Sequence, residues 1–313
     1  MRWLLRDLYK AMRNNVLITG GTGLVGKHLK DIMPNAIYLS SQDADLTNPK
    51  SAHQMMQHYN PDVVVHLAAR VGGISDNIAS PVDYLEDNVL INTNVLRACH
   101  EADVGRVISI LSTCIYPDKV DRYPMSEQEL FNGPPPPDNF AYAMSKRCAA
   151  AQIDAYVEQY GKEWCYLIPC NLYGEHDKYE EHHSHFISAL IKKIYEATDS
   201  IQVWGTGKPL RQFMHAEDLA RVIQHMIENH IVSNLNVAPD YVHSIDEMTK
   251  MGMKACGRED LKIEYDGTKP DGQYRKDVDS SKLLSTMKDF NFTPLEEGIR
   301  RVYDNFSQRY NKS

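Results

Sequence analysis

A glycine-rich turn between a short apolar run and a helix constrains the fold of this chain more than any other feature. Residues 16–19 read as a buried strand, residues 24–32 have the pattern of a helix, and Gly20, Gly23 and Gly26 lie in and around the connection. The first glycine permits a tight turn, the second lets backbone approach a pyrophosphate, and the third allows close helix packing. The helix N-terminus adds N–H donors. The turn therefore predicts dinucleotide binding, with an unoccupied structural turn as the alternative.

Strands and helices alternate through the first half of the chain. Further strands are expected at residues 36–39, 62–67, 106–111 and 164–169, and long helices at 82–102 and 142–160. This alternation predicts an α/β fold with a doubly wound parallel Rossmann sheet, whose ligands bind at the carboxyl edge of the strands. Beyond about residue 175 the pattern loosens into helices at 184–197, 216–229 and 244–255 and short strands at 202–204, 235–237 and 262–265.

We expect three parts in the chain of 313 residues. Residues 1–15 form an N-terminal extension, read as a short helix with a weak targeting peptide as the alternative. Residues 16–175 form the dinucleotide-binding domain, to which about 199–236 return. Residues 176–313 form mainly a smaller mixed α/β substrate lobe.

Composition excludes several classes of protein. The net charge of -8 argues against a nucleic-acid surface, which would be basic. No apolar stretch approaches the roughly 20 residues of a membrane span. The six cysteines have no paired spacing, which indicates reduced thiols and a cytoplasmic protein. No metal site is expected, because His182, His183 and His185 lack a partnering cysteine or carboxylate pattern.

Tyr142 and Lys146 lie four residues apart in an expected helix and so share one face. A neighbouring ammonium favours the ionised phenol, and such a tyrosine can give a proton to a carbonyl oxygen while a nicotinamide delivers hydride. Ser112 ends an expected strand, where its hydroxyl can bond the same carbonyl. The three residues together predict a ketone/alcohol oxidoreductase.

The choice between NAD and NADP depends on the end of the second strand. An NAD site has a carboxylate about 20 residues beyond the first glycine, which holds the ribose 2′-hydroxyl. Ser40, Ser41 and Gln42 stand there instead, so a 2′-phosphate is not repelled and the hydroxyls can bond it. This favours NADP, although no arginine stands beside them. Asp45 either faces the adenine or caps the next turn.

Two further sets of residues have a functional and a structural interpretation. Cys114 is either a buried filler or, with His185 across a cleft, a group that removes and returns protons on carbon. Trp204 and Arg211 suit stacking on a base and pairing with a diphosphate. A core tryptophan with a surface arginine is the alternative for that pair.

At these residues the chain resembles the extended short-chain dehydrogenase/reductases, and within them the GDP-L-fucose synthases. The matching stretches cover nearly all of the chain after residue 15, namely 16–26, 65–73, 112–118, 142–146, 169–177, 185, 203–218 and 269–272. The stretches around Cys114, His185 and residues 71–73 are typical of the synthases, and the others are shared with the wider group.

The resemblance implies that NADPH and GDP-4-keto-6-deoxy-D-mannose are the substrates. It implies epimerisation at carbons 3 and 5, then reduction at carbon 4 to GDP-L-fucose. Cys114 would take the protons and His185 would return them. Ser112 and Tyr142 would hold the enolate oxygen, and Tyr142 would protonate the carbon-4 oxygen. Lys146 would lower the pKa of Tyr142 and hold the nicotinamide ribose.

The resemblance also implies the binding residues and the assembly. The cofactor contacts are Gly20, Gly21, Thr22, Gly23, Leu24, Val25, Gly26, Ser40, Ser41, Asp45, Leu67, Ala68, Ala69, Tyr142, Lys146, Pro169, Asn171, Leu172 and His185. The substrate contacts are Val71, Gly72, Asn171, Lys193, Val203, Trp204, Arg211, Asp271 and Lys276. A homodimer is expected through a four-helix bundle of residues 82–102 and 142–160.

Two other functions share parts of this pattern. A UDP-sugar 4-epimerase that retains NAD would use the same serine, tyrosine and lysine, but it would need neither Cys114 nor His185. A catalytically silent dinucleotide-sensing scaffold would be expected to lack Ser112, Tyr142 or Lys146, and all three are present.

Overall fold

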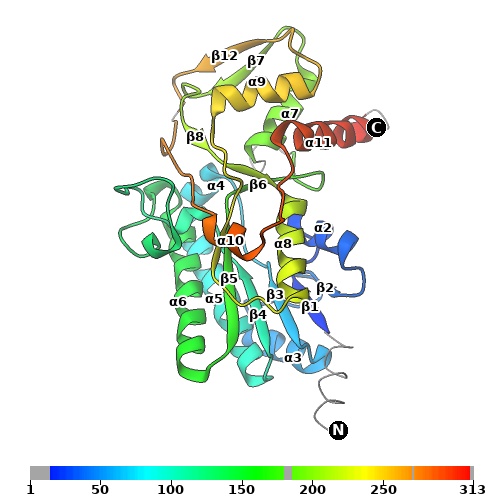
Figure 1. The fold of residues 1–313 in the computed structure, drawn as a ribbon, viewed down its shortest axis with the longest axis vertical. Coiled ribbons are helices and arrows are strands. Elements are labelled where there is room, and N and C mark those ends of the chain that lie inside the picture. The colour runs from blue at the N-terminus through cyan, green and yellow to red at the C-terminus, as the bar shows by residue number, and fades with distance from the viewer. Residues whose placement is uncertain (1–14, 180–184, 270, 311–313) are drawn as a thin grey trace.

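The computed structural model describes residues 15–179, 185–269 and 271–310, so the expected extension lies outside it except for Asn15. Its centre is a six-stranded sheet in the order β10-β5-β4-β3-β1-β2 (Figure 1). The strands are β1 Val16–Thr19, β2 Ile37–Leu39, β3 Val63–His66, β4 Arg106–Ile110, β5 Glu163–Pro169 and β10 Leu235–Val237. All neighbouring strands run parallel, which confirms the predicted doubly wound α/β fold.

The central strands are short apolar runs that are buried along their whole length. Every residue of β1, β3 and β4 is buried, as parallel strands covered on both faces require. The strand order reverses between β1 and β3, where the buried Thr19 hydroxyl and His66 Nδ1 lie 2.8 Å apart. This reversal is the place where an open α/β sheet binds its ligand.

Helices cover both faces of the sheet (Figure 1). One face carries α3 (Pro49–Tyr59), α5 (Pro81–Glu101) and α6 (Phe140–Tyr160), and the other carries α2 (Leu24–Ile32) and α8 (Ala216–Glu228). The helix α3 is not among the predicted elements. It begins after Asn48, whose side chain accepts the Lys50 and Ser51 N–H groups, with proline in the first helical position.

A second group of elements lies above the carboxyl edge of the sheet (Figure 1). The strand β7 (Ser200–Trp204) pairs in parallel with β12 (Lys262–Asp266). Three helices pack together beside this pair, namely α7 (Phe186–Glu196), α9 (Ile245–Ala255) and α11 (Leu295–Tyr310). The chain that was expected to return to the sheet at about residue 199 thus forms β7 first, and the return begins only with α8 and β10.

Short elements connect these two groups. They are two strand pairs, β6 (Asn171–Tyr173) with β9 (Phe213–His215) and β8 (Leu210–Arg211) with β11 (His243–Ser244), the helices α4 (Ile74–Ala79) and α10 (Ser281–Thr286), and the 3-10 turns Thr113–Ile115, Glu127–Glu129 and Pro137–Asn139. Among the described residues, no helix is both long enough and apolar enough to cross a membrane.

A buried arginine joins the sheet to the end of α8. Arg106 at the start of β4 is only 5% exposed, and its guanidinium donates to the carbonyls of Met226, Ile227 and Ile231 at 2.9, 3.1 and 3.3 Å. The last carbonyls of a helix have no partner within the helix, and a cation also opposes the helix dipole there. The contact therefore adds charged donors to a buried helix end, where the Met226 and Ile227 carbonyls also accept the backbone N–H groups of Ile231 and His230.

We expect Arg106→Met to lower the free energy of unfolding by about 3 kcal/mol, because buried carbonyls lose charged donors. Arg97→Met is the matched control. Arg97 is 71% exposed in its side chain and, within the described part of the chain, forms its ion pair with Glu101 on the same helix, so its loss is expected to cost less than about 0.5 kcal/mol. Urea unfolding of both variants measures the difference, and equal losses would contradict the structural role of Arg106.

Candidate active site

The glycine turn lies against the loop that follows β3. Gly20 has a positive φ of 70°, and a Cβ there would lie 2.8 Å from the Ala68 backbone nitrogen. A Cβ on Gly26 would lie 2.6 Å from the Gly21 carbonyl oxygen. Both positions therefore exclude any larger residue. The turn and residues 67–69 thus form one backbone surface at the edge of the sheet where the strand order reverses.

The predicted cofactor residues after β2 bond their own loop. The Ser40 N–H and hydroxyl both donate to Asp43 Oδ2 at 2.7 Å, and these bonds hold the pKa of Asp43 below its usual value. Asp45 accepts from the Thr47 N–H and hydroxyl at 3.0 and 2.6 Å, so it caps the next turn. A 2′-phosphate would therefore compete with Asp43 for the Ser40 hydroxyl, and Ser40 as a cofactor contact stays a prediction.

The predicted catalytic serine, cysteine and lysine lie close to the end of β4. Ser112 follows this strand, and its Oγ accepts from the Cys114 N–H at 3.5 Å. Lys146, on the buried side of α6, donates to the Ile110 carbonyl at 2.8 Å. Its ammonium also lies 5.9 Å from the centre of the Tyr142 ring. Residues from β4, the turn after it and α6 are thus brought together as the sequence predicts.

Burial has a larger effect than the neighbouring charges on the pKa values of the groups in this cluster. It raises the pKa of Tyr142 well above its usual range, and the nearby Cys114 and Tyr84 raise it further. Burial lowers the pKa of Lys146 to about 8. The expectation that Lys146 lowers the pKa of Tyr142 is therefore not met, because the same burial that weakens the ammonium penalises the phenolate. A neutral phenol in this place is a proton donor.

The Cys114 thiol belongs to the same cluster. Its side chain is only 2% exposed, and burial raises its pKa, while the charges of Lys276 and Lys146 and the contact with Ser112 act in the opposite direction. The charge of Cys114 is also one of the causes that raise the pKa of Tyr142. The positive charges of Lys276 and Lys146 thus favour the thiolate form of Cys114 against the effect of burial.

His185 is held from a different direction. It precedes α7, and its Nδ1 lies 3.0 Å from both carboxylate oxygens of Asp177. The Asp177 side chain is 4% exposed and also accepts from the Ser188 hydroxyl at 2.5 Å. Burial alone would lower the pKa of His185, but the hydrogen bond and charge of Asp177 raise it above the usual value. His182 and His183 lie outside the described residues.

The predicted substrate residues form a cationic and aromatic surface in the upper part of the molecule. Trp204 is 56% exposed, and the ammonium groups of Lys193 and Lys269 lie 5.9 and 5.4 Å from its ring. Arg211 is partly buried, and burial lowers its pKa. The alternative of a core tryptophan with a surface arginine is thereby excluded, because the tryptophan is the exposed side chain and the arginine is the partly buried one.

Arg211 and Lys276 form a pair of cations close to Cys114. Burial lowers the pKa of Lys276, and the charge of Arg211 lowers it further, whereas Cys114 and Asp138 oppose this shift. Two half-buried cations held together favour a multiply charged anion between them. Asp138, which also acts on Arg211, was not predicted as a site residue.

The remaining predicted residues frame these groups. Asp271 accepts from the Thr206 N–H and hydroxyl at 2.6 and 2.8 Å, which fixes the loop after β7. Asn171 donates to the Gln212 carbonyl at 2.9 Å. The others are placed as follows: Val71 is 58% exposed, Gly72 lies against Tyr84, Val203 is buried in β7, Pro169 ends β5, Leu172 lies in β6, and Thr22, Leu24 and Val25 surround the start of α2.

The main residue that sequence reasoning missed is Asp177. It lies in the stretch 169–177 that carries the resemblance, but nothing in the sequence marks it as the partner of His185. The two are eight residues apart in the sequence, and only the fold shows that their side chains meet. Buried acids of this kind are recognised from their surroundings and not from their spacing.

The fold and the groups at its carboxyl edge are those of a Rossmann enzyme that acts with a dinucleotide. The model of the NAD dependent epimerase/dehydratase family matches residues 16–238, and the chain belongs to this family.

Similar proteins narrow the relationship. A probable GDP-L-fucose synthase of Drosophila melanogaster is 37% identical, covering 95% of this chain and 98% of that protein. The GDP-L-fucose synthase of Dictyostelium discoideum is also 37% identical, covering 95% and 97%. The structure of a GDP-L-fucose synthetase from Naegleria fowleri bound to NADP has a TM-score of 0.85 at 33% identity, covering 96% of this chain and 94% of that chain.

Asp177→Asn is expected to lower the pKa of His185, because the variant removes the negative charge that stabilises the imidazolium and leaves the effect of burial. An NMR titration of the His185 ring, assigned with His185→Gln, measures the shift. His225→Gln on the outer part of α8 is a control that should leave the His185 titration unchanged. An unchanged pKa in Asp177→Asn would contradict the contact.

Proposed function

We propose that this chain converts GDP-4-keto-6-deoxy-D-mannose to GDP-L-fucose with NADPH. The observation that carries the proposal is the buried cluster in which the Cys114 thiol, the Tyr142 phenol, Ser112 and Lys146 lie together. A reductase alone needs the phenol, and the thiol adds a group that can move protons on carbon. Relatives that bear the name of this activity match the chain over almost its whole length.

The glycine turn fits a dinucleotide pyrophosphate. Backbone packs so closely around Gly20 and Gly26 that side chains are excluded, which leaves N–H groups at the start of α2 open to a phosphate. NADPH, when bound, supplies the hydride for carbon 4 of the sugar. We assign it to this chain because the Naegleria fowleri structure is bound to NADP. Lys146 and residues 67–69 would hold its ribose and nicotinamide side.

Proton movements in the epimerisation follow from the cluster. The 4-keto group makes the hydrogens on carbons 3 and 5 acidic, and Ser112 and Tyr142 would bond the enolate oxygen that forms. Cys114, between Lys276 and Lys146, would take each proton. His185 would return a proton to the other face, and its raised pKa suits an acid.

Reduction uses the phenol. Tyr142 would give its proton to the carbon-4 oxygen as hydride arrives at carbon 4, and Lys146 would stabilise the phenolate that remains. The raised pKa of Tyr142 keeps this proton on the phenol until the oxygen becomes basic. One buried site thereby serves both halves of the reaction.

The upper surface suits the GDP part of the substrate. The exposed Trp204 offers a face for a base, and Arg211 and Lys276 offer charge for a diphosphate. We therefore propose that residues 16–175 with α8 and β10 hold the dinucleotide, and that the other residues of 176–313 hold the GDP-sugar. Cytoplasmic localisation is supported by the cysteines, all six of which are free.

Cys114→Ser and Tyr142→Phe separate the two halves of this chemistry. Cys114→Ser is expected to slow exchange of the substrate carbon-bound hydrogens with solvent deuterium by about 10²–10⁴-fold. Tyr142→Phe is expected to abolish net oxidation of NADPH, because no proton donor remains for the carbon-4 oxygen. NMR of the deuterated sugar and absorbance of NADPH measure the two effects.

Cys256→Ser, a cysteine of the upper part of the molecule, is the control and should retain both activities. Unchanged exchange in Cys114→Ser would remove the thiol from the mechanism. If the wild-type chain instead interconverts UDP-sugars without net loss of NADPH, a UDP-sugar epimerase replaces the proposed function.

A homodimer through α5 and α6 is also proposed. The two helices pack on each other within the chain. They also expose large apolar side chains, with Val82, Leu85 and Leu90 exposed by 61%, 39% and 45% on α5, and Met144 and Val157 by 36% and 38% on α6. An exposed apolar surface on two adjacent long helices supports pairing with the same helices of a second copy into a four-helix bundle.

The double variant Leu85→Glu, Leu90→Glu is expected to sediment as a monomer, because two charges would be buried in the bundle. Val232→Glu, which changes an apolar residue exposed by 43% elsewhere, is expected to leave the dimer intact. Analytical ultracentrifugation at matched concentrations distinguishes the species. A wild-type monomer at micromolar concentration would contradict the proposed bundle.

A further inference from the structure

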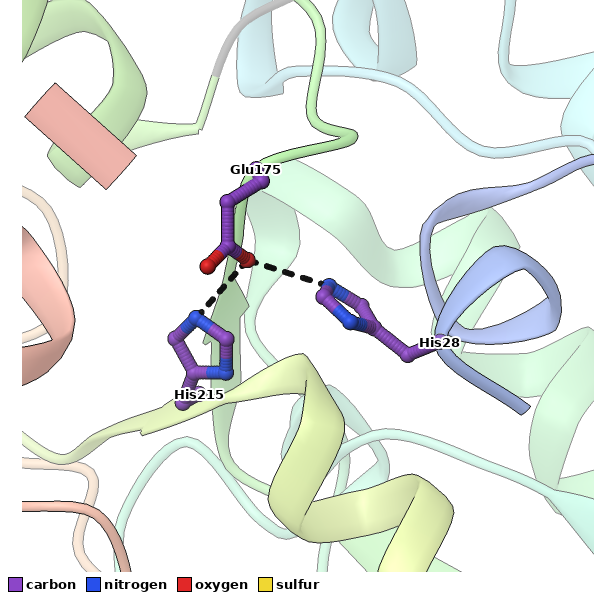
Figure 2. Close-up of side chains that lie close together, drawn as sticks. All are labelled: His28, Glu175 and His215. Carbon is purple, nitrogen blue, oxygen red and sulfur yellow. Dashed lines mark ion pairs between the residues drawn. The ribbon is translucent and has the colours of Figure 1, made fainter. Parts of the chain in front are cut away.

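Two histidines and a glutamate converge behind the candidate active site. His28 comes from α2, Glu175 from the turn after β6, and His215 from the end of β9, directly before α8 (Figure 2). Glu175 Oε2 lies 3.5 Å from His28 Nε2 and 3.0 Å from His215 Nε2. None of the three belongs to the chemistry proposed above. We propose that these three side chains form a binding site for a divalent transition-metal ion of the zinc class.

The three proposed ligand atoms are buried and have no hydrogen-bond partners outside their own group. His28 is 5% exposed and His215 is fully buried. Apart from their contacts with one another, the three atoms have no hydrogen-bond partner among the described residues; they are His28 Nε2, Glu175 Oε2 and His215 Nε2. Buried polar atoms are almost always satisfied, so three such atoms pointing at one place need a common partner. An ion among them satisfies all three at once.

The spacing of the three atoms matches tetrahedral coordination. All three lie within 4.8 Å of one another. Bonds of about 2.0–2.1 Å from zinc to nitrogen or oxygen set neighbouring tetrahedral ligands about 3.3 Å apart. The contacts of 3.0 and 3.5 Å bracket that value. Two imidazoles and one carboxylate are also a donor set that zinc takes with three protein ligands and a water.

The surroundings leave room and negative charge for a cation. The site borders a recess of about 230 Å³, which offers an entry path and space for a water ligand. Three carboxylates, Asp31, Glu175 and Glu217, and one guanidinium, Arg301, line the recess and leave a formal charge of −2. Arg301 contacts the other oxygen of Glu175, Oε1, at 3.2 Å, so Oε2 remains directed at the histidines.

Neighbouring backbone and side chains are arranged to hold the ligands. A Cβ on Gly174 would lie 2.8 Å from His28 Nε2, so a larger residue there would displace the ring. Metal binding at His215 Nε2 places the ring proton on Nδ1. In this structure Nδ1 accepts the Glu217 backbone N–H at 3.3 Å, so ion binding would exchange that hydrogen bond for one from Nδ1 to the Glu217 carboxylate, which lies 3.9 Å away.

The ion would act by joining segments, not by touching the substrate. Glu175 lies two residues before Asp177, which holds His185. Binding Glu175 to α2 and α8 would fix the turn that carries Asp177. The proposed role of the ion is therefore structural. Titration with the metal and the thermal stability of the chain test this role independently of turnover.

The test is titration of Zn²⁺ into the chelator-treated full chain, followed by calorimetry. We expect one equivalent to bind the wild-type chain and to raise its Tm. His28→Gln and Glu175→Gln each remove a direct ligand of the ion. Loss of an outer-shell partner weakens metal binding by about 10–100-fold, and loss of a direct ligand is expected to weaken it more. The Zn²⁺-dependent rise in Tm should disappear in both variants.

Two controls locate the site. Asp31→Asn tests an overlapping set, since His28, Asp31 and His176 could also surround an ion. His58→Gln replaces an exposed histidine on α3. Both are expected to bind Zn²⁺ like the wild type, and near-ultraviolet circular dichroism verifies that every variant is folded.

Replacement of Zn²⁺ by Co²⁺ in the wild-type chain adds a test that needs no variant. Four-coordinate Co²⁺ with nitrogen and oxygen ligands is expected to absorb strongly in the visible range. A thiolate charge-transfer band would place the ion on cysteines and overturn the proposal. So would the absence of stoichiometric binding, unchanged binding in Glu175→Gln, or loss of binding in Asp31→Asn.

Discussion

The common direction of the six central strands is the constraint on which the rest of the structure depends. Because all strands are parallel, their carboxyl ends lie at one edge, and the reversal of order between β1 and β3 opens that edge to a ligand. The glycine turn, residues 67–69 and Ser112 follow the ends of strands, and Pro169 is the last residue of β5. Groups that are far apart in sequence are thereby gathered without any long-range signal in the chain.

Burial then decides the chemistry of the gathered groups. In the cluster beneath the edge it raises the pKa values of the phenol and the thiol and lowers that of the Lys146 ammonium. Each group is thus moved toward its neutral form, and a small electrostatic change at the substrate can transfer a proton between them. At His185 the charge of Asp177 outweighs burial, so the same molecule holds one group ready to be cationic.

The structure also shows why parts of the site could not be predicted. The pKa of Tyr142 was expected to be lowered by Lys146 because the two share a helix face. Helix geometry gives the distance, but the dielectric environment depends on what covers the pair. The Ser40 hydroxyl was predicted as a group that can bond a 2′-phosphate, and only the structure shows that it donates to Asp43 in a local turn. Asp177, Asp138 and the group around Glu175 meet their partners only after the chain has folded.

Among the elements, periodicity predicted strands and helices wherever apolar residues fill a whole strand or one helix face. Periodicity did not predict α3, because its amphipathic run is short. Asn48 and Pro49 are nevertheless typical of a helix start. Periodicity also could not assign β7, which looks like any exposed alternating strand. Only its pairing with β12, about 60 residues further along the chain, decides that it lies in the upper part of the molecule.

Local patterns and residue chemistry in the sequence specify the parallel fold and the dinucleotide turn, and they single out the serine, tyrosine and lysine as candidate site residues, to which the resemblance adds the cysteine. The tertiary structure alone decided which groups are buried, which charges face each other and which histidines converge. Those properties arise from contacts between distant segments, and their energies depend on desolvation, which no local pattern encodes.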